Sequence, residues 1–396
     1  RRALPLSPAP LKSLPLKQLG LLPRIHWDTG LEKSWQPGEA GAAQRLRRLA
    51  SLLPDYVRAR DVPGADGTTR LSPHLHFGEL SPRQAWRALA QATSGQTAGI
   101  LRGAEMLERE LLWREFAQHV LHHFPHTPEA PLNPRFANFP WRRAPQLLAA
   151  WQHGRTGIPI VDAGMRELWA TGSMHNRVRM ITASFLTKHM GIDWRAGARW
   201  FWDTLVDADL ASNTLNWQWV AGCGADAAPY FRIFNPVLQS RKFDAQGKYL
   251  RRWLPELARL PDRHIHEPWR APESVRQAAG VQLGKDYPAP VLDLGTARSA
   301  ALARWRDPQL GLLAPAAGRL LTPADDVLAP EMPAAVISDR FWERRFGRSR
   351  DAIGKTVTIR DRVFTIVGVT PPVFRSLRPD RAPDLVLPLT VTLPDD

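Results

Sequence analysis

Helical spacing of apolar positions dominates the first three quarters of the chain. Within residues 40–123 apolar side chains recur every three to four positions, with Ser72 and Ser81 as expected N-caps of two helices. The pattern resumes at residue 145 and continues with short turns to about residue 210. Alternating strand patterns are scarce before residue 300, so this part is predicted to be mainly α-helical.

The last part of the chain has a different pattern. Ser338 is placed to cap a short helix that ends at Gly347, and residues 355–360 and 362–369 alternate as two strands. This predicts a small α+β unit. Residues 1–36 contain five prolines among many leucines, which favours an irregular leading arm.

The positive charge is concentrated in the helical part. The 396 residues carry a net charge of +15, and residues 1–307 hold 41 basic and 27 acidic side chains. The same part holds 15 of the 16 tryptophans. The chain therefore joins two segments that differ in charge and tryptophan content. The positive charge of the first segment favours a phosphate-bearing partner over an acidic protein.

Cysteine content and hydropathy exclude several classes of protein. Cys223 is the only cysteine, so an internal disulfide or a four-thiolate metal site is excluded. No apolar run approaches the roughly 18 residues of a spanning helix. We expect a soluble, cytoplasmic monomer; because the chain begins with Arg1, it is expected to be a processed or truncated piece.

One helix face combines groups that make a poor core stripe. Glu110, Trp113, Arg114 and Ala117 follow helical spacing and share a face. They offer an acid, a large ring, a cation and a small residue, which suits a ligand pocket. The alternative is an ordinary amphipathic helix whose tryptophan is buried and whose charges are solvated.

A second polar face is predicted near residue 176. Helical spacing groups Asn176, Arg179 and Met180, and an ion pair of Arg179 with Asp207 would satisfy both charges if they are buried. Asp207 and Asp209 could instead be a solvated acid pair, and a metal site is the weaker interpretation.

Several tryptophans cluster in the sequence. Trp217 and Trp219 lie two residues apart and so face different sides of a helix, and with Trp141 and Trp194 they suit base stacking and one-electron chemistry. Two other patterns are given less weight: the glycine pattern of residues 222–227, which does not follow a strand, and the four histidines of residues 119–126. Residues 67–72 offer hydroxyls and a helix start that suit a phosphate, although an ordinary capped loop has the same composition.

Four long segments resemble the FAD-binding domain of the photolyase and cryptochrome family. They are GTTRLSPHLHFGELSPRQ from Gly67, ERELLWREF from Glu108, TGIPIVDAGMRELWATGSMHNRVRMITASFL from Thr156 and DADLASNTLNWQWVAGCGADAAPYFRIFNP from Asp207. The resemblance covers residues 15–305 and implies an all-helical domain that holds a U-shaped FAD.

The resemblance also implies roles for individual residues. Those around the FAD would be Tyr56, Thr68, Thr69, Arg70, Leu71, Ser72, Arg114, Arg179, Asp207, Asp209 and Asn213. Those lining the pocket for a flipped pyrimidine dimer or contacting DNA would be Glu110, Trp113, Asn176, Arg177, Met180 and Trp219. Trp217, Trp194 and Trp141 match the family's electron-relay chain, and Ala117 replaces a residue that is often a larger aromatic in repair enzymes.

The implied activity is a light-driven, FAD-dependent carbon–carbon lyase that repairs cyclobutane pyrimidine dimers in DNA. The Asn at position 213 resembles the repair branch. The alternatives are a cryptochrome-like photoreceptor that binds FAD and DNA without repair, and a flavin-free relic.

The residue patterns and the family resemblances together predict three segments. Residues 1–38 would be a linker that follows an absent antenna domain, and residues 39–307 the helical FAD- and DNA-binding domain. Residues 308–396 would be an α+β fragment, since about residues 320–389 resemble the extracytoplasmic core domain of macrolide-exporter-type transporter permeases. The two resemblances belong to different compartments, so a fused chain is expected.

Overall fold

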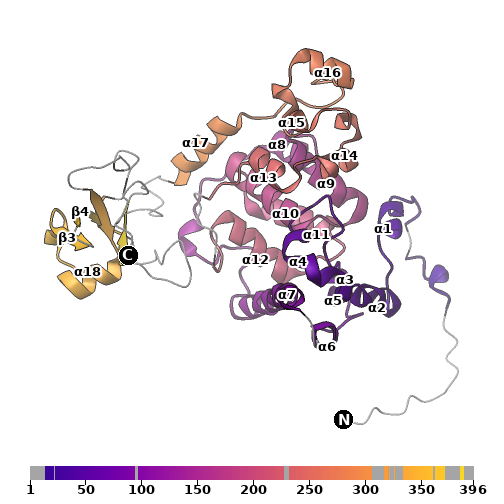
Figure 1. The fold of residues 1–396 in the computed structure, drawn as a ribbon, viewed down its shortest axis with the longest axis horizontal. Helices are drawn as coiled ribbons and strands as arrows, with labels where there is room; N and C mark the ends of the chain where they lie inside the picture. The colour runs from indigo at the N-terminus through magenta and orange to yellow at the C-terminus, as the bar shows by residue number, and fades with distance from the viewer. Residues whose placement is uncertain are drawn as a thin grey trace, which may run out of the picture.

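A computed structural model shows a helical body followed by a small sheet (Figure 1). It describes residues 14–21, 23–93, 97–226, 232–305, 316–319, 321, 325, 333–359, 362–370 and 384–387. The mainly α fold with a small C-terminal α+β segment, predicted from the sequence, is confirmed.

The helices before residue 130 form one half of the body. They are α1 Thr29–Ser34, α2 Glu39–Arg47, α3 Leu49–Leu52, α4 Tyr56–Ala59, α5 Ser72–His76, α6 Pro82–Thr93 and α7 Ala98–His123. A 3₁₀ turn, η2 Leu53–Asp55, precedes α4. α7 packs so closely on η2 that a Cβ on Gly103 would lie 2.1 Å from the Leu53 carbonyl oxygen.

The helices after residue 140 form the other half. They are α8 Pro145–Gln152, α9 Pro159–Thr171, α10 Asn176–Ser184, α11 Trp194–Thr204, α12 Leu210–Ala221, α13 Pro236–Phe243, α14 Lys248–Trp253, α15 Asp262–Ile265, α16 Glu273–Ala279 and α17 Leu294–Trp305. A π-helical turn, η4 Phe185–His189, continues α10, and a 3₁₀ turn, η6 Pro268–Arg270, follows α15.

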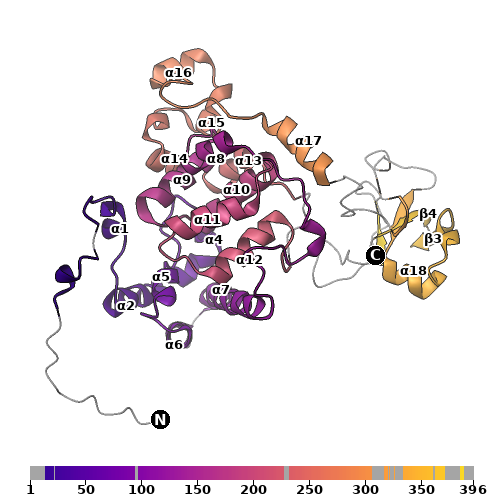
Figure 2. The same cartoon turned by 180° about the vertical axis from the view of Figure 1, so that it is seen from behind.

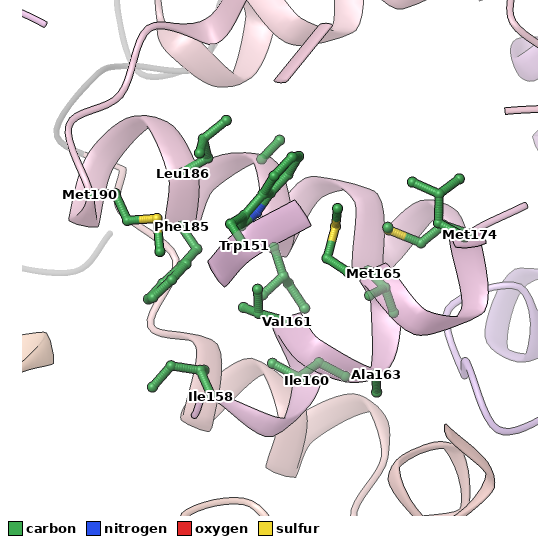
Figure 3. Packing of buried hydrophobic residues seen from close by; sticks show 14 of the residues in the cluster. Trp151, Ile158, Ile160, Val161, Ala163, Met165, Met174, Phe185, Leu186 and Met190 are labelled. Carbon is green, nitrogen blue, oxygen red and sulfur yellow. The ribbon is translucent and has the colours of Figure 1, made fainter. Parts of the chain in front are cut away.

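The largest hydrophobic cluster fills the second half. Figure 3 shows Trp151, Val161, Met165 and Phe185 together in it, all at most 1% exposed. The Trp151 indole keeps its hydrogen bond by donating to the Thr182 carbonyl at 3.1 Å, so no polar group is lost on burial. This core fixes α8 to α12 relative to one another.

The leading arm is partly helical, where the sequence predicts an irregular segment. α1 lies within it, and the Trp35 indole that follows donates to the Thr171 carbonyl at the end of α9 at 2.7 Å. A Cβ on Gly30 would lie 1.9 Å from the Ala170 carbonyl oxygen, so the two backbones touch. Contact with α9 is what orders this segment, and residues 1–13 lie outside the described part.

Of the two serine caps predicted in the helical part, one is confirmed. Ser81 accepts from the Gln84 backbone N–H at 3.2 Å, and the Gln84 side chain accepts from the Ser81 backbone N–H at 2.8 Å. This reciprocal pair is a capping box. The prediction for Ser72 was wrong, because α5 begins at Ser72 itself and Leu71 takes the cap position without a side-chain bond.

The C-terminal unit has the predicted α+β class, and its sheet is mixed, with three described strands besides the two predicted. Its strands are β1 Ala317–Gly318, β2 Ala334–Ile337, β3 Thr356–Ile359, β4 Arg362–Val369 and β5 Leu385–Val386. Their order is β1-β4-β2-β5, with β3 paired antiparallel to β4. Ser338 caps α18 Asp339–Phe346 and Gly347 ends it in the left-handed conformation.

The sheet has a hydrophobic core of its own. Ile337, Trp342, Ile366 and Val369 form it, and no residue of the helical body belongs to that cluster among the described residues. The sheet and its helix also stand apart from the helical body in both views (Figures 1 and 2). No helix in the ranges that the structure describes is long and apolar enough to cross a membrane.

Candidate functional site

The carboxylate of Glu110, on α7, is held by Tyr56 of α4 and by Arg60, the C-cap residue of α4. The Tyr56 hydroxyl donates to Glu110 Oε2 at 2.8 Å, and Arg60 Nη2 lies 2.7 Å from Glu110 Oε1. The Glu110 side chain keeps 34% of its surface exposed. The carboxylate therefore has a fixed orientation and still reaches solvent.

The same network extends to the first turn of α10. Asp61 lies 3.8 Å from Arg60 and 2.7 Å from Arg177. The Arg177 guanidinium also lies over the Phe243 ring, 4.5 Å from its centroid. Glu110 and Arg177, both predicted to meet the substrate, therefore belong to one chain of charged groups.

Burial sets the protonation of this network. It raises the pKa of Glu110, while Arg60 and the Tyr56 hydroxyl lower it. His175 is the N-cap of α10 and accepts from the Arg177 backbone N–H at 3.2 Å. Burial lowers the pKa of His175 to about 4, so the ring is neutral at pH 7.

A second polar group lies where α10 and the start of α12 meet. Arg179 Nη2 lies 3.4 Å from Asp207, which confirms the predicted ion pair, and its Nε donates to the Met174 carbonyl at 2.7 Å. Asp209 caps α12 by accepting from the Ser212 N–H at 2.7 Å. It also accepts from Gln118 of α7 at 2.9 Å, so Asp209 joins α7 to α12.

The tryptophans predicted to relay electrons lie in or against the main core. Trp217 and Trp194 are buried, and Trp141 packs against the same cluster. The Trp217 ring contacts Phe201 at 5.0 Å and Trp151 at 6.2 Å between centroids. A Cβ on Gly197 would lie 2.1 Å from the Trp217 ring, so α11 offers a flat surface for this indole.

Asn213, on the same helix, is half-buried. Its Nδ2 donates to the Ala198 carbonyl of α11 at 2.9 Å. This bond uses an N–H of the amide and fixes the side chain between α11 and α12. The side-chain oxygen keeps its capacity to accept a hydrogen bond.

The loop of residues 67–72, part of which the resemblance places around the FAD, has an unusual backbone at Arg70. Arg70 has φ of +53°, although it is not glycine, and its guanidinium lies 4.4 Å from the centroid of the Trp35 ring. Thr69 and Leu71 on either side are buried, whereas Ser72 is exposed and Thr68 is half-buried. Left-handed non-glycine residues concentrate at ligand sites, where surrounding contacts hold them in place.

The remaining predicted residues are less constrained. Trp113 is 50% exposed and meets Phe116 edge-on at 5.6 Å. Asn176 is exposed, Met180 and Trp219 are half-buried, and Arg114 pairs with its neighbour Glu115 at 2.9 Å. These side chains are placed on the same elements as the network but make few bonds that fix them.

Two weaker patterns are also resolved by the geometry. Gly222 ends α12 in the left-handed conformation, so the glycine pattern that begins there is a helix stop, as its position after a helix suggested.

The histidines of residues 119–126 lie close together but do not form a metal site. The ring centroids of His119 and His123 lie 4.3 Å apart. In the described part of the chain no group of three His, Cys, Asp or Glu residues could hold a metal ion.

Sequence reasoning missed Arg60, Asp61 and the cap of His175. Adjacent opposite charges ahead of a loop are common, so the sequence gives Arg60 and Asp61 no distinctive signal. Their importance comes from α7 and α10, which bring Glu110 and Arg177 to them.

Comparison with known proteins decides the family. The model for the FAD binding domain of DNA photolyase matches residues 106–307, half of the chain. The chain belongs to the photolyase and cryptochrome family. Residues 224–395 also match the model for a MacB-like periplasmic core domain, but the described residues up to 305 in that range lie within the helical body.

Named relatives fall on both sides of the family. The chain is 50% identical over 297 residues to a deoxyribodipyrimidine photo-lyase of Agrobacterium fabrum, covering 74% of this chain and 61% of that protein. It is 42% identical over 275 residues to Cryptochrome-1 of Arabidopsis thaliana, covering 68% of this chain and 40% of that one. The chain thus spans about three fifths of the first relative's length and two fifths of the second's.

A solved photolyase has the same architecture. The crystal structure of a bacterial class III photolyase from Agrobacterium tumefaciens is similar with a TM-score of 0.72 and 48% identity. The match covers 76% of this chain and 62% of that chain.

The site residues fit the FAD that the family domain binds. His175 Nε2 and Arg177 Nε are buried without a hydrogen-bond partner among the described residues. Such atoms in a native fold call for a missing polar partner. The hydroxyls of Thr68 and Thr69 and the cation of Arg179 are donors, and the carboxylates of Asp207 and Asp209 are acceptors. Together they suit a phosphate-bearing, hydrogen-bonding cofactor.

Proposed function

We propose that this protein is a light-driven lyase that splits cyclobutane pyrimidine dimers in DNA with bound FAD. The observation that carries the proposal is the position of Glu110. Its carboxyl group is oriented by Tyr56 and Arg60, reaches solvent, and is connected through Asp61 to Arg177.

The FAD would lie between α5, α10 and α12. Tyr56 and the loop of residues 68–72 would contact its phosphates and ribityl chain. Asp207, Asp209, Arg179 and Arg114 would lie along the cofactor, and Asn213 would face its flavin ring. The Arg179–Asp207 pair keeps both charges compensated, so neither is stranded when the cofactor excludes water.

The lesion would enter beside Glu110. Trp113 and Trp219 offer rings for stacking on an extruded base, and Asn176 and Met180 line the first turns of α10. Arg177 would meet a DNA phosphate at the rim. The net positive helical part would hold the DNA backbone without reading its sequence.

When bound, reduced FAD would supply a light-driven electron to the dimer and recover it after the dimer has split, so no net oxidant or reductant is needed. The chain's own residues orient the dimer, exclude water and hydrogen-bond the pyrimidine edge. Glu110 would stabilise the charge that develops there, since a fixed hydrogen-bonding group costs no reorganisation during the reaction. Trp217, Trp194 and Trp141 would conduct an electron from the surface to the cofactor.

A cryptochrome-like photoreceptor is the second candidate. The 42% identity to Cryptochrome-1 favours it, because that identity extends over 275 residues. We further propose that the protein is cytoplasmic and monomeric. The proposed domain division stays at residues 1–38, 39–307 and 308–396.

Glu110→Ala tests the repair proposal. We expect the variant to retain FAD and to lose most of its repair quantum yield, because the dimer loses a fixed hydrogen-bonding partner. Repair is measured with a dimer-containing oligonucleotide under blue light, and FAD content from the visible spectrum. Glu105→Ala is the control, since this exposed carboxylate lies on the same helix. Unchanged repair in Glu110→Ala would remove Glu110 from the mechanism, and absence of repair in the unaltered protein would favour the photoreceptor.

A further inference from the structure

Phe116 is an exposed aromatic residue to which the proposed repair activity assigns no role. It lies on α7, six residues after Glu110, and is 37% exposed. A single apolar side chain on a protein surface is common and needs no explanation. Phe116 calls for one because its ring contacts Trp113, the indole that is proposed to stack on the extruded lesion.

The rings of Trp113 and Phe116 meet almost at right angles. Their centroids lie 5.6 Å apart, and their planes make an angle of 81°. Edge-to-face pairs at this separation are a preferred arrangement of aromatic rings, because the positive edge of one ring meets the negative face of the other. The contact therefore favours one orientation of the Trp113 indole over orientations in which the ring meets only water.

The helical spacing of α7 makes Phe116 the natural support for Trp113. The two residues are three positions apart, and side chains at that spacing are neighbours on a helix surface. The neighbour four positions after Trp113 is Ala117, which is 2% exposed and offers only a methyl group. On the other side, the Glu110 carboxylate accepts from the Tyr56 hydroxyl. The aromatic support therefore comes from Phe116.

The Trp113 ring has little else to hold it. The residue is 50% exposed, and its indole makes no hydrogen bond within the part of the chain that the structure describes. An exposed side chain samples several rotamers, and ordering it when a ligand binds costs conformational entropy. A neighbour that orders the ring beforehand removes part of this cost, so the ligand binds more tightly.

We propose that Phe116 is a positioning residue for the lesion. It holds the Trp113 indole edge-on, so that the exposed surface of the indole is oriented to stack on the extruded pyrimidine dimer. The inference rests on the proposed function, because it needs a lesion on which Trp113 can stack. Phe116 acts through Trp113 and makes no contact with the reacting bases. Its effect should therefore appear in the affinity for damaged DNA, whereas undamaged DNA is held through its phosphates.

The test compares binding of FAD-loaded protein, in the dark, to one oligonucleotide with and without a single cyclobutane dimer. We expect Phe116→Ala to weaken binding of the damaged strand about three- to tenfold and to keep the undamaged strand within twofold. Phe116→Tyr keeps the ring and should bind the dimer like the unaltered protein. Phe116→Leu keeps apolar bulk without a ring and should be weakened like Phe116→Ala. FAD content and the repair quantum yield at saturating substrate should be unchanged, since Glu110 keeps its contacts.

A double-mutant cycle separates positioning from direct contact with DNA. In a Trp113→Ala background, Phe116→Ala should have no further effect, because the ring that Phe116 holds is gone. Phe124→Ala is the matched control. Phe124 is 43% exposed at the C-cap of the same helix, and its ring contacts His126. This variant should bind both strands like the unaltered protein.

Four results would overturn the inference. Unchanged dimer affinity in Phe116→Ala would remove the role, and an equal loss with and without Trp113 would make Phe116 a direct DNA contact. An equal loss on damaged and undamaged strands, or in Phe124→Ala, would assign the effect to the general DNA surface. Thermal midpoints show whether each variant folds, and the comparison of Phe116→Leu with Phe116→Tyr stays valid if Phe116→Ala does not. Failure of the proposed function is distinct, because the unaltered protein would then neither prefer the damaged strand nor repair it under blue light.

Discussion

At the scale of single residues, Glu110 combines two opposing influences. Its burial favours the protonated form, and the nearby Arg60 favours the ionised form. Arg60 is therefore a positioning residue that also sets the protonation of Glu110.

Arg60→Met should raise the pKa of Glu110, because it removes the cation and keeps the bulk of the side chain. The midpoint of the pH dependence of repair quantum yield should then move to higher pH. Arg58→Met is the control, since Arg58 lies on the same helix, pairs with Asp55 and is 77% exposed. An unshifted midpoint in Arg60→Met would show that Arg60 acts on Glu110 by shape alone.

Asp162 predicts a pH dependence of stability. It is fully buried and accepts from the Thr156 and Gly157 backbone N–H groups at 2.7 and 2.9 Å and from the Tyr287 hydroxyl at 2.6 Å. Burial raises the pKa of Asp162 to about 6. The unfolded chain loses this proton first as the pH rises, so the stability that Asp162 contributes falls between about pH 4 and pH 6, by at most about 3 kcal/mol.

Asp162→Asn should remove that part of the pH dependence. At neutral pH the variant should still be less stable by about 1–3 kcal/mol, because the amide nitrogen cannot accept and a buried donor is left unsatisfied. Urea unfolding midpoints at acidic and neutral pH measure both effects. An equal pH dependence in the two proteins would contradict the assignment.

At the scale of elements, α7 joins the two halves of the site. Glu110 faces Tyr56 on one side, and Gln118 bonds Asp209 of α12 on another. Its distance from η2 is set by Gly103, which has no room for a side chain.

Gly103→Ala should force α7 away from η2, because the added Cβ would meet the Leu53 backbone at 2.1 Å. We expect a loss of about 1–3 kcal/mol in stability, in the range for overpacking, and a lower repair yield as Glu110 moves from Tyr56. Gly99→Ala is the matched control one turn earlier, where the nearest atom lies 3.9 Å away. It should be neutral or stabilising through helix propensity. Thermal unfolding of both variants measures the difference, and equal midpoints would refute the packing argument.

The sequence predicted those elements correctly whose bounds depend only on neighbouring residues. The Ser81 cap, α18 with its Ser338 and Gly347 ends, and the β3–β4 pair follow from neighbouring residues. Ser72 failed as a cap because α5 begins one residue earlier than its sequence pattern suggests. α1 could not be predicted, because its order comes from contact with α9 far along the chain.

At the scale of the whole molecule, the helical body and the sheet have separate hydrophobic cores. A chain that ends at residue 307 should therefore keep its FAD content and the thermal midpoint of the helical body. The control is a chain that ends at residue 293 and lacks α17, whose Arg304 donates to the Lys188 carbonyl at 3.0 Å. This shorter chain should be less stable. Loss of flavin from the 307-residue chain would show that the sheet supports the body.

The sequence by itself determined the helical class, the α+β unit, the uneven charge and the family resemblance. These depend on local periodicity, composition and long motifs, which survive without knowledge of the fold. Only the tertiary structure decided that Glu110 meets Tyr56 and Arg60, that Asp61 connects Arg60 to Arg177, and that Asp209 joins α7 to α12. These are contacts between distant segments, and protonation depends on burial, so neither can be obtained from the spacing of residues along the chain.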